Sequence, residues 1–317
     1  MLTHVYYNLK PYVPWQVRLA VRRIVARRKR RQHASTWPID PTAAKRPAGW
    51  PGWPDGKKFA FVITHDVEDV IGVQKCRDLF SLELAHGFRS SFNFIPEGPY
   101  RVSPELRNEL TRAGFEVGIH DLRHDGKLFR SRHEFRQSAE RINGYIHQWS
   151  ASGYRSGFML RQLDWLHDLA IVYDASTFDT DPFEPQPDGA GTIFPFWISH
   201  PDEKATGRGV SGRGYVELPY TLPQDSTLFL VLRETSPEIW LRKLDWIASH
   251  GGMALVNVHP DYVNFSNRRT RREFPATHYA ELLQHVTAKY AEEFWNPLPH
   301  ELAAWFKKTH DCGIVAR

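Results

Sequence analysis

The sequence predicts an α/β protein in which about seven parallel strands alternate with helices and form a distorted (β/α) barrel. From residue 58 onward, short apolar runs typical of buried strands alternate with stretches of helical periodicity. Acidic residues and histidines follow directly after several of these runs, where a parallel barrel places its active site. A chain of 317 residues is long enough for such a barrel and an N-terminal extension.

The expected elements follow one another along the chain as short apolar strands and longer periodic helices. Strands are predicted at 58–64, 90–95, 115–120, around Tyr154, and at 170–176, 192–198, 215–218 and 253–259. Helices are predicted at 72–86, 103–113, 131–148, 160–170, 236–249 and 277–291. Ser103 and Ser131 are suitable N-cap residues, Pro104 fits a first helical turn, and Gly114 ends the helix that Ser103 begins.

Charge and composition divide the chain into residues 1–57, a basic helical extension with a Pro- and Gly-rich linker, and residues 58–317, the barrel. The first 50 residues contain eleven Lys or Arg and one Asp, a net charge of +10, whereas the whole chain carries +5. The remainder is therefore acidic overall, and nucleic-acid binding is not expected. Two cysteines, no secretory signal and no apolar run of membrane-spanning length favour a cytoplasmic protein.

Residues 13–33 are predicted to form a basic amphipathic helix, because Val17, Ala20, Val21 and Ile24 recur at helical spacing between arginines. Tyr6, Tyr7 and Tyr12 precede this helix, and Trp15 lies at its start. Two interpretations are open. Either the helix makes peripheral contact with an anionic membrane, at its inner face, or it packs its apolar stripe on the barrel and exposes its charges to water.

The polar residues that follow the predicted strands form groups suited to metal chemistry. His120 and His124 are four residues apart after the third strand, so both imidazoles can face one cation. Asp66 and Glu68 follow the first strand and share one side of an extended chain. Two imidazoles, one carboxylate and an open position for water are a common hydrolytic zinc arrangement. A divalent cation, with zinc expected, would also offset the repulsion among the acids.

Four motifs in this order resemble those of the polysaccharide deacetylases, carbohydrate esterase family 4, which share the NodB homology domain. The resemblance covers roughly residues 58–262. The matching residues are, in order, Asp66 with Glu68, His120 with His124, Arg155 in "YRSG", and His259 at the end of "LVNVH". Four ordered motifs are much more specific than any one of them.

The resemblance implies a metal set and a catalytic set in this chain. The metal ligands would be Glu68, His120 and His124, and the catalytic residues would be Asp66 as general base, His259 as general acid and Arg155 as the partner of Asp66. An acid should also orient His259 and raise its pKa. The sequence leaves three candidates for this acid open, namely Asp179, Asp181 and Glu217.

The motifs also depart from the family pattern in four places, one of which is that the tryptophan of the fourth motif has no clear match in this sequence. Val67 separates the two acids, so Asp69 is an alternative to Glu68 as the carboxylate ligand. Asp121 stands where the family has Ser or Thr, and is either a partner of a ligand histidine or exposed. Gly157 replaces the proline of the arginine motif.

The implied reaction is removal of an N-acetyl group from an amino sugar in a glycan or a lipid-linked glycan precursor, with release of acetate. The long aromatic segment 178–197 is expected to form a substrate-binding lip, with Phe183, Phe196 and Trp197 available to stack on sugar rings. Tyr262 is expected to face the pocket. Two other functions are open: hydrolysis of another small amide, of the deformylase or ureide type, and a degenerate site in a membrane-associated glycan-assembly factor.

Overall fold

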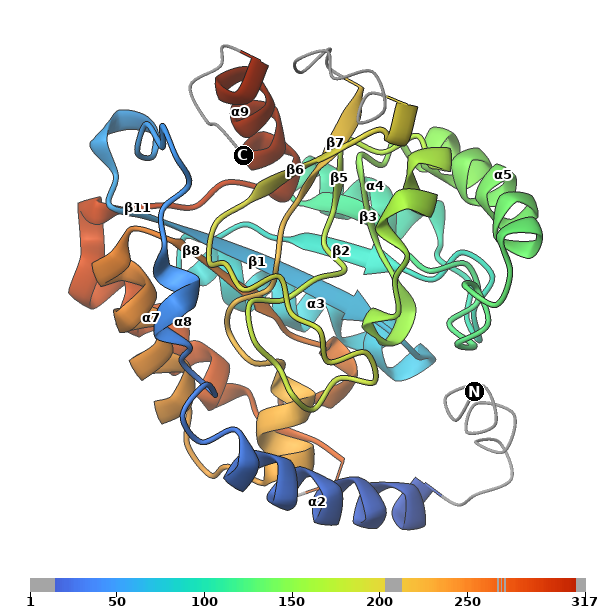
Figure 1. Cartoon of the computed structure of the whole chain (residues 1–317). Coiled ribbons are helices and arrows are strands. Elements are labelled where there is room, and N and C mark those ends of the chain that lie inside the picture. The colour runs from blue at the N-terminus through green and yellow to red at the C-terminus, as the bar shows by residue number, and fades with distance from the viewer. Residues whose placement is uncertain (1–14, 203–212, 267, 269, 271, 312–317) are drawn as a thin grey trace.

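The computed structural model describes residues 15–202, 213–266, 268, 270 and 272–311, and its centre is a curled, mostly parallel sheet (Figure 1). The strands of this sheet are β1 (Phe59–Val67), β2 (Ser91–Phe94), β3 (Glu116–His120), β4 (Gly153–Arg155), β5 (Tyr173–Asp174), β6 (Phe196–Ser199), β7 (Gly214–Glu217), β8 (Met253–Asn257) and β11 (Phe294–Trp295). The order β8-β1-β2-β3-β4-β5-β7 is parallel throughout, β6 is antiparallel to β7, and β11 pairs with the start of β1.

The sheet curls until the segment after β7 reaches β8. The amides of Thr221 and Leu222 both donate to the carbonyl oxygen of Leu255, each over 3.0 Å. The hydroxyl of Thr221 donates to the carbonyl oxygen of Met253 over 2.7 Å. These bonds join the two sides of the sheet, so the distorted (β/α) barrel predicted from the sequence is confirmed.

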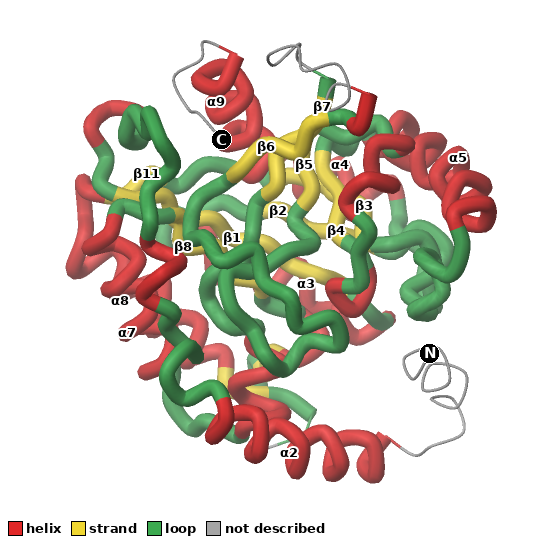
Figure 2. Tube along the Cα trace, viewed as in Figure 1, coloured by secondary structure: helices red, strands yellow, loops and turns green. Residues whose placement is uncertain are grey.

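Helices surround the sheet, as Figure 2 shows in red around the yellow strands. The α-helices are α2 (Trp15–Gln32), α3 (Val70–Ala85), α4 (Pro104–Arg112), α5 (Arg132–Trp149), α7 (Glu238–His250), α8 (Ala276–Tyr290) and α9 (Pro299–Asp311). Shorter helical segments are η2 (Pro41–Ala44), η3 (Pro54–Gly56), η4 (Gly157–Met159), η5 (Leu163–Asp168), the π-helix η6 (Ser226–Leu232), η7 (Pro260–Tyr262) and η8 (Ala291–Glu293). A separate two-stranded sheet pairs β9 (Val263–Asn264) with β10 (Phe274–Pro275).

The predicted N-caps are confirmed, whereas several predicted elements are shorter than expected. The hydroxyl of Ser103 accepts from the amide of Leu106, and that of Ser131 accepts from the amide of Glu134, each over 3.2 Å. In place of the helix expected at 160–170, the structure has the six-residue 3₁₀-helix η5. An α-helix of only six residues would form few backbone hydrogen bonds for the conformational entropy it loses. The strand expected at 170–176 is reduced to the two residues of β5, which pair with the short strands β4 and β7.

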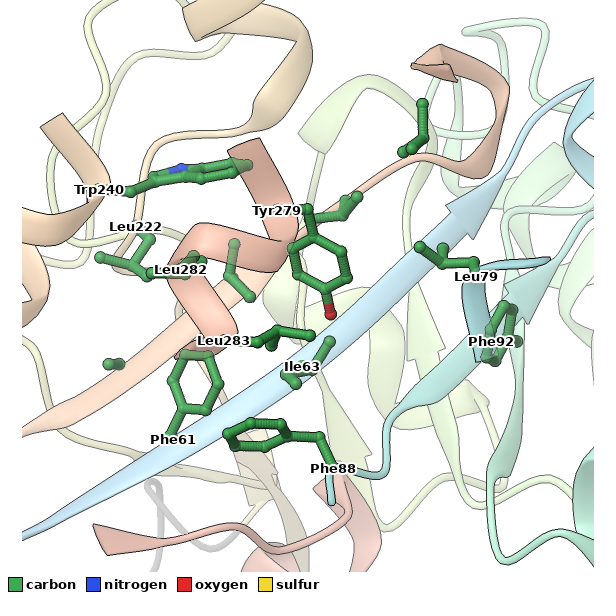
Figure 3. Packing of buried hydrophobic residues seen from close by; sticks show 14 of the residues in the cluster. Phe61, Ile63, Leu79, Phe88, Phe92, Leu222, Trp240, Tyr279, Leu282 and Leu283 are labelled. Carbon is green, nitrogen blue, oxygen red and sulfur yellow. The ribbon is translucent and has the colours of Figure 1, made fainter. Parts of the chain in front are cut away.

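The main core lies between the sheet and the helices α3, α7 and α8, part of which is shown in Figure 3. Strand β1 is buried along its whole length, as expected of a central parallel strand covered on both faces. Phe61 and Ile63 on this strand belong to the same cluster as Trp240 of α7 and Tyr279 of α8 (Figure 3). His65, which the sequence analysis did not assign to a metal or catalytic set, is buried here and satisfied by the carbonyl oxygen of Val258 and the carboxylate of Glu83.

The segment that precedes β1 packs closely on the barrel. Trp37 and Ala43 are buried in the main core cluster. Trp50 and Trp53 contact Trp305 of α9, with ring centroids 5.6 and 5.2 Å apart. Helix α2 lies along the outside of the molecule and packs against η6 (Figure 1). None of the described helices is both long and apolar enough to cross a bilayer.

Candidate active site and metal centre

A cavity of about 1100 Å³ lies at the carboxyl ends of the central strands. Part of its lining comes from residues at or just after the ends of β1, β3, β4 and β8, which the parallel sheet brings to one edge. The residues of this group are Asp66, Glu68, His120, His124, Ser156 and His259. The positions expected from the strand ends therefore meet in one place.

Glu68, His120 and His124 form a group that could hold a metal ion. One ligand atom from each of these residues lies within 4.8 Å of the others. The Nδ1 atom of His120 lies 3.1 Å from the carbonyl oxygen of Arg155. Because a carbonyl oxygen only accepts, Nδ1 carries the proton, and the lone pair of Nε2 remains for a cation.

The donor set fits a divalent cation. The Nε2 atom of His120 is buried and has no hydrogen-bond partner within the described part of the chain, whereas the buried Nε2 atom of His124 lies 3.2 Å from Glu68 Oε1. A buried acceptor left without a partner is costly unless a ligand satisfies it. Burial lowers the pKa of His120, which favours the neutral ring that a metal requires. Two imidazole nitrogens and the carboxylate of Glu68 suit zinc or a similar ion.

Glu68, rather than Asp69, is the carboxylate that faces the two histidines. Tyr262 donates to Glu68 Oε2 over 2.7 Å, and the amide of Glu68 donates to Asp261 over 2.9 Å. Burial alone would raise the pKa of Glu68, but the adjacent His124 holds this pKa well below its usual value. Asp69 instead caps α3, where its carboxylate accepts from the amide of Val70 over 2.6 Å.

The turn that presents His124 is held by Asp121. Both residues adopt a positive φ, 57° for Asp121 and 53° for His124. Asp121 is buried, and its carboxylate accepts from the amides of Leu122 and Gly157 over 2.6 and 3.1 Å. A Cβ atom on Gly157 would lie 2.5 Å from Asp121 Oδ2 and 2.7 Å from the ring of His124. Glycine therefore allows a close approach that a proline at this position would block.

Asp66 is a fully anchored carboxylate beside the metal group. The side-chain amides of Asn93 and Asn257 donate to its two oxygens over 3.0 and 2.8 Å. Arg155, which is completely buried, approaches it with Nε at 3.4 Å. Burial alone would raise the pKa of Asp66, but nearby positive charge, above all on Arg155, outweighs this effect and holds the pKa at about 2. Asp66 is therefore an anion throughout the physiological pH range.

His259 is oriented by Asp225, which the sequence analysis did not identify. The Nδ1 atom of His259 lies 2.6 Å from Asp225 Oδ1, and its backbone amide donates to Asp225 Oδ2 over 2.8 Å. Burial would lower the pKa of His259, but the charge and hydrogen bond of Asp225 raise it to about 10. The imidazole is thus a protonated acid at neutral pH, with Nε2 4.0 Å from Glu68.

The three acids considered as partners of His259 are engaged elsewhere, so that expectation is wrong. Asp179 forms a buried ion pair with Lys243 at 2.8 Å. Asp181 and Glu217 accept hydrogen bonds from Tyr220 and Thr177, respectively. A sequence signal for Asp225 did exist, because an Asp-Ser pair before an apolar run is typical of a helix start. The side chain of Asp225 indeed accepts from the amide of Ser226, over 2.7 Å, at the beginning of η6.

The residues predicted to bind substrate are only partly brought together. Tyr262 lines the cavity. Trp197 and Phe196 lie on the edge strand β6 outside the cavity lining, and Trp197 is buried in a core cluster with Val216. From the same aromatic segment, Phe183 does line the cavity.

Two cavity residues that the sequence analysis missed have a strained backbone. Phe158 and Met159 line the cavity, and both adopt a positive φ, 57° and 53°. The ring of Phe158 stacks on the imidazole of His124 with centroids 4.1 Å apart. The strain therefore places an aromatic face directly against a candidate metal ligand.

Helix α2 also contributes to the cavity, which the sequence analysis did not anticipate. The α2 residues that line it are Val17, Arg18, Leu19, Val21, Arg22 and Lys29. The basic extension is thus in contact with the candidate active site and not only with the outside of the barrel.

No protein-family model matches the sequence, and no curated protein matches it significantly. Solved structures do match. A Mycobacterium smegmatis protein assigned as a polysaccharide deacetylase aligns with a TM-score of 0.60 at 19% identity, over 84% of this chain and 96% of the other. A peptidoglycan deacetylase from Bacillus subtilis aligns with a TM-score of 0.44 at 13% identity, over 82% of this chain and 97% of the other. A carbohydrate esterase family 4 pseudoenzyme from Bacillus anthracis aligns with a TM-score of 0.45 at 13% identity, over 79% of this chain and 66% of the other. On the first of these alignments, the chain has the fold of the polysaccharide deacetylases, the NodB-type fold of carbohydrate esterase family 4.

Proposed function

We propose that this chain is a metal-dependent hydrolase that removes an N-acetyl group from an amino sugar in a glycan or a lipid-linked glycan precursor and releases acetate. One observation carries the proposal. A two-histidine, one-carboxylate group lies in the same cavity as an ionised carboxylate, Asp66, and a protonated imidazole, His259. The fold shared with a structure assigned as a polysaccharide deacetylase supports the same reaction class.

The arrangement has the groups that amide hydrolysis needs. A divalent cation, with zinc expected, held by Glu68, His120 and His124 would acidify a water molecule and polarise the amide carbonyl. Asp66, kept ionised by Arg155, accepts a proton from the attacking water. His259 gives its Nε2 proton to the departing nitrogen, so that water and the amide become acetate and an amine. Asp225 stabilises the charged imidazole before that transfer.

The experiment that tests this function measures acetate release from N-acetylglucosamine oligosaccharides by the purified chain. His120→Ala should abolish acetate release, because it removes one of two imidazole ligands. His133→Ala, an exposed histidine at the start of α5, is the matched control and should keep full activity. Acetate release that survives in His120→Ala would refute the proposal. Formate or ammonia released in its place from other amides would favour the deformylase or ureide alternative.

We also propose that the enzyme acts in the cytoplasm, in peripheral contact with the inner face of the membrane through residues 13–33, of which 13 and 14 lie outside the described part. Ile24 and Val25 on α2 are 68% and 47% exposed and lie between arginines, which supports this contact. Replacing both with Glu should lower cosedimentation with phosphatidylglycerol vesicles. Val172→Glu, at an exposed valine before β5, should not, and equal binding by both variants would refute the contact.

A further inference from the structure

Contacts with η6 fix the orientation of helix α2 about its own axis, so that one face of the helix packs on the barrel. Leu19 and Ala26 are buried in a cluster with Val231 of η6. On the same side, the guanidinium of Arg23 donates twice to the carbonyl oxygen of Leu230, over 3.0 and 2.9 Å. This anchoring determines which of the remaining α2 side chains line the cavity.

The anchored helix brings two arginines to the cavity wall. Arg18 and Arg22 are four residues apart, so they lie on one side of α2, and both line the cavity. Their neighbours on the helix are already engaged. Lys29 donates to the carbonyl oxygen of Pro182 over 2.5 Å, and Arg30 pairs with Glu234 over the same distance.

Arg18 and Arg22 have no comparable partners within the described residues. The Nε atom of Arg18 is buried and without a hydrogen bond there. Glu184 lines the cavity close enough for the charge of Arg22 to lower its pKa, and the side-chain amide of Gln224 donates to its carboxyl group over 2.7 Å. Burial raises the pKa of Glu184 to about 8, so at neutral pH this carboxyl group leaves the positive charge of the arginines largely uncompensated.

The same part of the cavity also exposes apolar side chains. Val17 and Val21 of α2 and Ile71 of α3 line the cavity and are 51%, 55% and 48% exposed. Half-exposed side chains of a cavity lining lie near its mouth. The mouth thus combines two guanidinium groups with an apolar rim, a combination that suits an anionic group attached to an apolar chain.

We propose that Arg18 and Arg22 form an anion-binding subsite at the mouth of the cavity, and that it binds a phosphate group. Placing the amino sugar deeper in the cavity, beside Glu68 and His259, rests on the proposed function. The phosphate has two sources: it is carried by the substrate itself, or it is the headgroup of a phospholipid at the membrane surface.

The test uses the full-length chain and two double variants with the same charge change. Arg18→Gln/Arg22→Gln removes the proposed subsite, and Arg27→Gln/Arg28→Gln removes two exposed arginines of α2 that do not line the cavity. Binding of N-acetylglucosamine 1-phosphate and of uncharged N-acetylglucosamine is measured by calorimetry. Binding to phosphatidylglycerol and phosphatidylcholine vesicles is measured by cosedimentation.

If the phosphate belongs to the substrate, Arg18→Gln/Arg22→Gln weakens binding of the sugar phosphate at least about tenfold and leaves binding of the uncharged sugar unchanged. Arg18→Lys/Arg22→Lys should restore part of this loss. If the phosphate belongs to a lipid headgroup, Arg18→Gln/Arg22→Gln weakens binding to phosphatidylglycerol vesicles and leaves binding of the sugar phosphate unchanged. The loss of vesicle binding is then larger than the loss caused by Arg27→Gln/Arg28→Gln. Equal behaviour of the two double variants in both assays overturns the proposal.

These readouts are independent of turnover. Arginine-dependent binding without acetate release would therefore refute the proposed function and leave the subsite in place. Acetate release that does not depend on these arginines, with equal binding by both double variants, would refute only the subsite.

Discussion

Replacing Asp225 with Asn should disable the general acid while preserving the volume of the side chain. Among the described residues, the groups that form hydrogen bonds with the carboxylate of Asp225 are donors: the ring Nδ1 and backbone amide of His259, and the amide of Ser226. The amide side chain of Asn has only one acceptor oxygen, so its NH₂ group must face one of these buried donors. Either the imidazole loses its proton on Nδ1 or a backbone amide is left unsatisfied.

The size of the effect follows from the role of His259. Without the charge of Asp225, the pKa of His259 falls from about 10, and the protonated fraction at neutral pH falls with it. General acid catalysis contributes about 10²- to 10⁴-fold, so kcat should fall at least about 100-fold while KM changes little. The alkaline limb of the pH–rate profile should move to lower pH, because the acid form of His259 is lost earlier.

The assay is acetate release from N-acetylglucosamine oligosaccharides across the pH range, with Asp245→Asn as the matched control. Asp245 forms an aspartate–histidine pair with His285 at 2.7 Å, and neither residue lines the cavity. The control should retain the activity and pH profile of the unmodified chain. A kcat of Asp225→Asn within about threefold of the original, with an unmoved alkaline limb, would show that His259 is not the acid or is not controlled by Asp225.

Two further predictions test the architecture around the site. Gly157→Ala should weaken zinc affinity by about 10- to 100-fold, measured by competition with a chromogenic chelator, because its Cβ would displace Asp121 or His124. Gly144→Ala on α5, where a Cβ meets nothing within 4 Å, should leave the affinity unchanged, and an equal affinity of both variants would contradict the role of Gly157. Glu184→Gln should flatten the pH dependence of stability between about pH 4.5 and 8. The folded-state pKa of Glu184, about 8, exceeds its ordinary value of 4.5, so the contribution of Glu184 to stability is fully present below about pH 4.5 and is lost as pH rises through 8. Urea unfolding at both ends of this window measures the slope, and an unchanged slope in Glu184→Gln would contradict the prediction.

The sequence predicts the barrel well, because its central strands are buried on both faces. Strand β1 reads as an apolar run followed by acids, and this local pattern fixes both the strand and the position of Asp66 at its end. His120 and His124 are close in sequence, so a turn is enough to bring them together. The candidate metal group therefore depends mainly on short-range order and on parallel strands that end at one edge.

The missed features depend on contacts between distant segments. Asp225 meets His259 only because the chain after β7 returns to β8, and three other acids were equally plausible from position alone. The periodicity of α2 shows that it has an apolar stripe but not which surface covers that stripe. Trp197 was predicted to stack on a sugar ring, but its side chain is buried in the core. Tertiary packing decides each of these cases.

The metal content of the purified chain tests the central claim most directly. Elemental analysis after purification without chelator, or after zinc is added and excess removed, should give about one divalent ion per chain. His120→Ala and Glu68→Ala should reduce this content to background, whereas Asp69→Asn and His133→Ala should retain it. A chain that binds no divalent ion, or one that keeps its full content in both His120→Ala and Glu68→Ala, would contradict the account.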